Sequence, residues 1–193
     1  MEFLAYSELV ESLNSYGVVE SPAGDVMRFD VKADEDKALE PARVLIRVAG
    51  VEKPEGLPET LGEKEIDAER FAGMVEELCH ITHVGDLAIV PAKTWGSILD
   101  VAAFDLASDE TWLEVDAEVS LHQNRRDPLA LTPESREIVT TITKALREHG
   151  EGEAQDMSVL PIEATVVFDV RCAGVILVTC GNRATAENIL SSL

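Results

Sequence analysis

The strictest alternation of apolar and polar residues in the chain is LEVDAEVSLH, residues 113–122. Every odd position in this segment is apolar and every even position is polar, which is the period of a β-strand with one buried and one solvated face. The segment therefore predicts a long strand, and its solvated face carries Glu114, Asp116, Glu118, Ser120 and His122. That face provides an acidic surface for water or a partner, or paired carboxylates for acid–base work or calcium binding.

Shorter segments on both sides of it also have strand character. Residues 26–32 and 43–48 are expected to pair as a hairpin with a long acidic loop, and residues 87–90 form a further short strand. Strands at 165–170 and 175–179 flank a tight turn at 171–174. The half-polar alternation of these strands favours antiparallel pairing.

Helical spacing of apolar residues appears between the strands. It predicts helices at 3–15, 67–79, 94–106 and 133–149, and a last helix after Asn182. Asn182 is a favourable N-cap, and Thr132-Pro133-Glu134 is a typical helix start. The fold class is therefore α+β, with a mostly antiparallel sheet and helices packed on one face. We expect a single domain over 1–193; the alternative is two similar halves, 1–85 and 86–193.

Charge is the most unusual property of the composition. The 193 residues include 37 Asp and Glu against 16 Lys and Arg, a formal net charge of −21. Such a chain repels phosphate backbones and anionic headgroups, which excludes nucleic acid and bare membrane as expected partners.

The N-terminal residues lack the basic start and apolar core of a signal peptide, and the apolar run at 175–178 is too short to span a bilayer. Three cysteines, odd in number and far apart, argue against a disulfide framework. The expected compartment is cytoplasmic.

The densest group of reactive side chains is Cys79, His80 and His83. On a helix, Cys79 and His83 lie about 40° apart, and thiolate with imidazole suits zinc. Against this, Cys79 borders the apolar stripe of its helix, His80 faces away from it, and no second close pair of ligands follows. The sequence therefore predicts no metal, with these three residues as the alternative.

Cys180 is the candidate nucleophile. It leaves a strand just before the helix that begins after Asn182, where a helix dipole lowers a thiol pKa, and His122 or His83 would be the base. Cys180 also continues an apolar strand, which favours a place in the core. No glycine-rich phosphate loop occurs.

Arg125 and Arg126 are adjacent arginines in a very acidic chain. They form the candidate anion site, next to the predicted helix start at Thr132. The alternative is that both pair with neighbouring carboxylates at the surface.

These observations favour a non-enzymatic binding or assembly protein without a cofactor. Its expected partner is a protein, with self-association as a symmetric dimer as the alternative. The competing hypotheses are a small enzyme, using a metal at Cys79, His80 and His83 or the thiol of Cys180, and an anion sensor at Arg125 and Arg126.

Overall fold

The centre of the sheet is a hairpin of β9 (Val166–Arg171) and β10 (Val175–Cys180). The two strands pair antiparallel, and Gly174 adopts a φ of 90° in the turn, which favours glycine because it has no Cβ. The hairpin predicted from the sequence is therefore confirmed. This computed structural model describes residues 2–122 and 129–193, without the side chains of 104, 105, 111 and 120–122.

Strands on both sides extend the hairpin into one sheet with the order β1-β7-β6-β8-β9-β10-β4-β5. Among the described strands, only the neighbours β4 and β5 run parallel. The protein is therefore α+β with a mostly antiparallel sheet, as predicted. The remaining strands of this sheet are β1 (Glu2–Ala5), β4 (Ala42–Val48), β5 (Gly62–Ile66), β6 (Leu87–Pro91), β7 (Leu129–Thr132) and β8 (Met157–Pro161).

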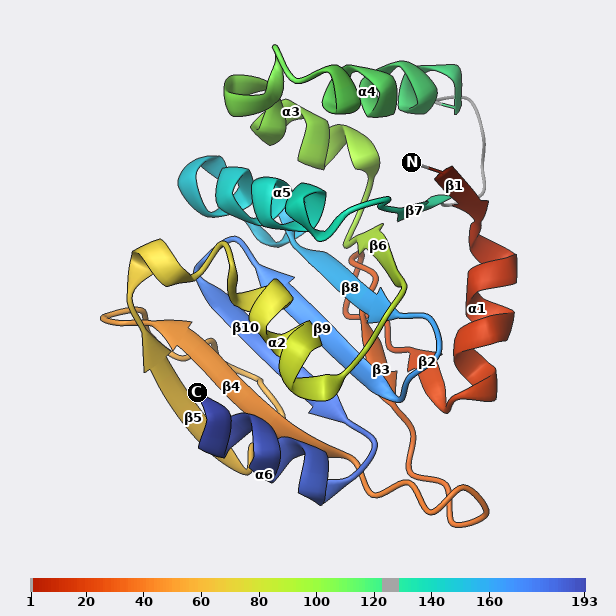
Figure 1. Cartoon of the computed structure of the whole chain (residues 1–193), viewed down its shortest axis with the longest axis vertical. Coiled ribbons are helices and arrows are strands. Elements are labelled where there is room, and N and C mark those ends of the chain that lie inside the picture. The colour runs from red at the N-terminus through yellow and green to blue at the C-terminus, as the bar shows by residue number, and fades with distance from the viewer. Residues whose placement is uncertain (1, 123–128) are drawn as a thin grey trace.

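The two faces of the sheet are covered differently (Figure 1). One face forms the larger apolar core with α2 (Met74–Thr82), α3 (Trp95–Leu106), α5 (Arg136–His149) and α6 (Arg183–Ser192). The other face packs against α1 (Tyr6–Ser15) and a small hairpin of β2 (Val18–Glu20) and β3 (Phe29–Val31). Two short 3₁₀ helices span Ala68–Arg70 and Glu153–Gln155. None of the described helices combines the length and the hydropathy needed to cross a bilayer.

The strand predicted at 113–122 is wrong, because these residues lie in the helix α4 (Glu110–His122). Trp112, Val115 and Val119 follow one another at helical spacings of three and four residues, and all three are buried. The apolar residues Leu113 and Ala117 of the same alternation are exposed instead. The alternation therefore arises from one buried row and one exposed apolar row on the same helix.

Two further predictions also need correction. The strands at 26–32 and 43–48 do not pair: β3 pairs with β2, and β4 lies between β10 and β5. The helix start predicted at Thr132 is displaced, because Thr132 ends β7 and α5 begins after Ser135. β4 and β7 pair with strands distant in the sequence, β10 and β1, whereas β3 pairs with the nearby β2.

A buried ionic cluster fixes the small hairpin to the sheet. Arg28, just before β3, donates from Nη1 to Oδ1 of Asp169 (2.6 Å) and from Nη2 to Oδ2 of Asp156 (2.8 Å). Oδ1 of Asp156 also accepts the backbone N–H of Cys172 (2.9 Å). Desolvation raises the pKa of Asp156, against the opposing effect of Arg28. The side chains of all three residues are nearly inaccessible, so the pairing compensates charge that water cannot reach.

Candidate functional site

The structure does not bring Cys79, His80 and His83 together. Cys79 points into the core beside Leu78, whereas His80 and His83 are exposed. His83 follows the end of α2 with a left-handed φ of 54°, which turns the chain away from the helix. Desolvation raises the pKa of the Cys79 thiol to about 11. Across 2–122 and 129–193, no group of three or more His, Cys, Asp or Glu side chains is arranged to hold a metal ion.

Cys180 is the last residue of β10 and is fully buried in the large core. Desolvation alone raises the pKa of its thiol to about 12, opposite to the change that a nucleophile needs. The helix after it begins as predicted: Oδ1 of Asn182 accepts the backbone N–H of Thr185 (2.9 Å). The cap is therefore present, and the thiol beside it faces the core.

Arg125 and Arg126 lie outside the described residues, so the predicted anion site stays a prediction. The backbone of His122 ends α4. Trp95 and Trp112 are both buried, and Nε1 of Trp95 donates to the backbone oxygen of Leu129 (3.1 Å).

The surface that combines unusual charge with exposed apolar area is α4. Its inner face packs Trp112, Val115 and Val119 into the large core. Oδ1 of Asp109 accepts the backbone N–H of Trp112 (3.1 Å), which satisfies one of the free donors at the start of the helix. In Figure 1, α3 and α4 lie at one end of the molecule, beyond α5.

The outer face of α4 carries Leu113, which is 49% exposed and is the large hydrophobic side chain most open to water in the described part of the chain. Exposed Glu110 and Asp116 stand one helical turn before and after it, and Glu114 adjoins it. Residues 94–122, which lie between Lys93 and Arg125, contain no Lys or Arg, and their acids are Asp100, Asp105, Asp109, Glu110, Glu114, Asp116 and Glu118. We call this segment, residues 94–122, the acidic helical hairpin.

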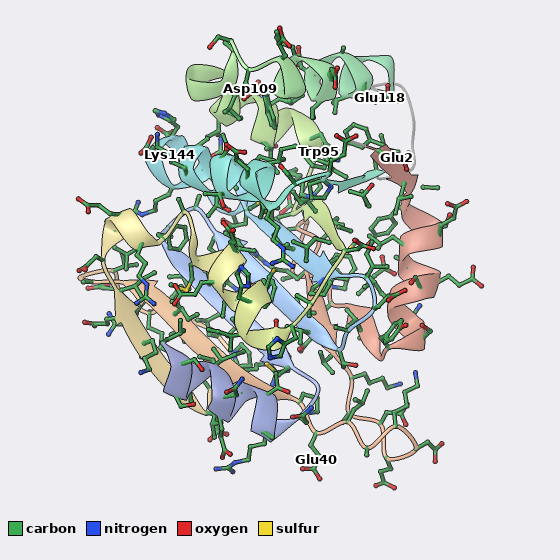
Figure 2. All side chains as sticks on the ribbon, viewed as in Figure 1. Glu2, Glu40, Trp95, Asp109, Glu118 and Lys144 are labelled. Atoms are coloured by element: carbon green, nitrogen blue, oxygen red, sulfur yellow. The ribbon has the colours of Figure 1, made fainter. Side chains whose placement is uncertain are left out.

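A hollow lies on each side of α4. The first, of about 240 Å³, lies between α4 and α5 and has Trp112 and Ile138 in its wall with Asp109 and Glu137. The second, of about 360 Å³, is lined by Glu2, Phe3, Glu114, Val115 and Glu118. Figure 2 shows Asp109 and Glu118 towards opposite ends of the helix, with Glu2 near the second of them. Both hollows combine apolar walls with carboxylates, and neither is lined by Lys or Arg.

No family model, curated protein or solved structure matches this chain. The acidic helical hairpin therefore has to be interpreted from its own chemistry.

Sequence reasoning identified part of this surface and misplaced the rest. It found an acidic face containing Glu114, Asp116 and Glu118, but assigned it to a strand whose apolar face included Leu113. The signal for the helix was present in Asp109 as a cap and in the spacing of Trp112, Val115 and Val119. With the helical period of 3.6 residues in place of the strand period of two, Leu113 is assigned to the surface and not to the core.

Proposed function

We propose that this chain is a non-enzymatic binding protein whose acidic helical hairpin docks a basic, amphipathic segment of a protein partner. The observation that carries the proposal is Leu113, an exposed leucine on a helix surrounded by carboxylates. Isolated exposed apolar residues are common on monomers, but Leu113 stands among the exposed carboxylates of α4 and so offers an apolar contact inside a charged rim. The two hollows beside α4 add further apolar walls with carboxylates.

Charge decides what kind of partner fits. A second copy of α4 would place carboxylates against carboxylates, which opposes a symmetric dimer through this surface. A segment with Lys or Arg beside one or two apolar residues satisfies both features of the surface. The rim charges accelerate encounter and make binding sensitive to salt, and the apolar contact with Leu113 slows dissociation.

The test uses a synthetic helical peptide of Lys and Leu with its leucines on one face, and a scrambled peptide of the same composition. Binding is measured by fluorescence anisotropy at low and at physiological salt. We expect the amphipathic peptide to bind more tightly than the scrambled one. We expect Leu113→Ser to weaken it by about tenfold, the scale of one buried apolar contact.

Matched charge variants separate docking from general attraction. Glu114→Gln/Asp116→Asn removes two carboxylates from α4, and Glu35→Gln/Asp36→Asn removes the same two groups from the exposed loop between β3 and β4, at the opposite end of the molecule (Figure 1). Only the α4 variant should weaken binding clearly, by several-fold. If the two peptides bind with equal affinity, or if the two double variants lose affinity equally, net charge alone explains the binding. Either result would overturn the proposal.

A further inference from the structure

A third hollow with a different chemistry lies on the face of the sheet that carries β2 and β3. It measures about 280 Å³, just below the usual range for ligand pockets of roughly 300–1,000 Å³. Its floor is formed by β4, β9 and β10. One wall is the segment around Arg28 to Asp30, and the other is the loop from Glu55 to Pro58, with Glu153 at the rim. We call it the arginine pocket.

The register of the sheet explains which side chains form the floor. Thr179 of β10 lies directly beside Arg43 of β4, and Leu177 lies beside Asp169 of β9. Because directly paired residues point to the same face, these side chains gather opposite the large helical core. The floor thus has a polar part at Arg43 and Thr179 and an apolar part at Leu177.

The two aspartates of this pocket are engaged, but the guanidinium groups keep unused donors. Both oxygens of Asp30 accept from Nη2 of Arg43 (2.9 and 2.7 Å), and Asp169 accepts from Arg28 and from Nε of Arg171 (3.0 Å). Nε of Arg43 is buried and has no hydrogen-bond partner among the described residues. Each guanidinium has five N–H donors, so Arg43 and Arg171 retain donors for a further acceptor.

The rim has the opposite character. Glu55 and Glu153 are exposed carboxylates of the lining, and half-buried Leu57 packs against the apolar group that contains Leu177. A ligand that matches the arginines, the rim and the apolar floor needs three groups. It presents a planar pair of acceptor oxygens to the arginines and a cation to the rim glutamates. A small apolar group then contacts Leu57 and Leu177. A guanidinium fork matches the geometry of a carboxylate.

We propose that the arginine pocket binds a small zwitterion of the amino-acid type. Its carboxylate accepts from Arg43 and Arg171, its ammonium group faces Glu55 and Glu153, and its side chain contacts Leu57 and Leu177. Phosphate and dicarboxylates fit less well, because the paired aspartates neutralise the floor and the rim glutamates repel a second negative charge. This site is separate from α4 and does not depend on the proposed protein partner.

The first experiment screens the twenty standard L-amino acids, each at about 10 mM, for a rise in melting temperature of the purified full-length protein. The amino acid with the largest rise is then compared by calorimetry with its amide, which lacks the carboxylate, and with its analogue lacking the amino group. We expect each truncated molecule to bind at least about tenfold more weakly. Absence of a rise for all twenty, or equal binding of the truncated molecules, would overturn the proposal.

Conservative variants then locate the site. Arg43→Lys keeps the charge and removes the fork, and Glu153→Gln neutralises an exposed carboxylate. Each should weaken binding of the selected amino acid by about tenfold, while Arg70→Lys and Glu69→Gln, exposed residues of the turn Ala68–Arg70, should leave it unchanged. Circular dichroism confirms that each variant is folded. Unchanged affinity in both Arg43→Lys and Glu153→Gln would show that the amino acid binds elsewhere.

Discussion

Cys79, Cys172 and Cys180 are buried and form no disulfide, and the pKa of each thiol is raised. Desolvation raises the pKa to about 11 for Cys79 and Cys172 and to about 12 for Cys180. The pKa of a cysteine thiol in an unfolded chain is about 8.5. Between these values the folded protein binds more protons than the unfolded chain, so the free energy of unfolding falls as the pH rises above about 8.5.

This dependence of stability on pH can be tested by removing the thiol of Cys180. Between about pH 7.5 and 9.5, each buried thiol should lower the free energy of unfolding by about 1.4 kcal/mol. Urea denaturation of Cys180→Ala should therefore show a fall about 1.4 kcal/mol smaller than that of the unchanged protein over the same interval. Equal falls in the two proteins would mean that Cys180 is not held protonated, and would favour the thiol-enzyme hypothesis again.

At the scale of elements, the parts that local signals predicted correctly have their partners close in sequence. The hairpin of β9 and β10 needed only two apolar strands and Gly174, and α6 needed only Asn182 as its cap. The sequence did not predict the pairing of β1 with β7 or the contacts of Arg28, because their partners lie more than a hundred residues away. The arginine pocket was missed for the same reason: Arg43, Asp169 and Thr179 meet only once the sheet is assembled.

The reassignment of α4 can be tested with two substitutions. A strand over 113–122 would bury both Val115 and Ala117, whereas the helix buries Val115 and exposes Ala117. We expect Ala117→Lys to change the free energy of unfolding by less than about 0.5 kcal/mol. Val115→Lys should lower it by about 3 kcal/mol or more, because it places a charge in the apolar core. Chemical denaturation measures both, and comparable large losses would restore the strand.

At the scale of the whole molecule, the sheet interleaves strands from both ends of the chain. β4 and β5 precede residue 85, yet β4 pairs with β10 and β5 forms the edge beside β4, while β1 pairs with β7. Ile46 of β4 is fully buried and lies opposite Ile176 of β10 in the large core, to which the only tryptophans, Trp95 and Trp112, also belong. A cavity in β4 should therefore destabilise the region that the tryptophans report, although it is distant from them in sequence.

Ile46→Ala tests this coupling directly. The substitution should lower the free energy of unfolding by about 2–5 kcal/mol, the usual cost of truncating a buried isoleucine. If the sheet unfolds as one unit, tryptophan fluorescence and far-ultraviolet circular dichroism will report the same displaced midpoint in urea. A fluorescence midpoint that stays in place while the dichroism changes in two steps would show that 1–85 and 86–193 unfold separately. In that case the register between β4 and β10 would contribute little to cooperativity, and the arginine pocket, which spans that register, would open before the core around α4.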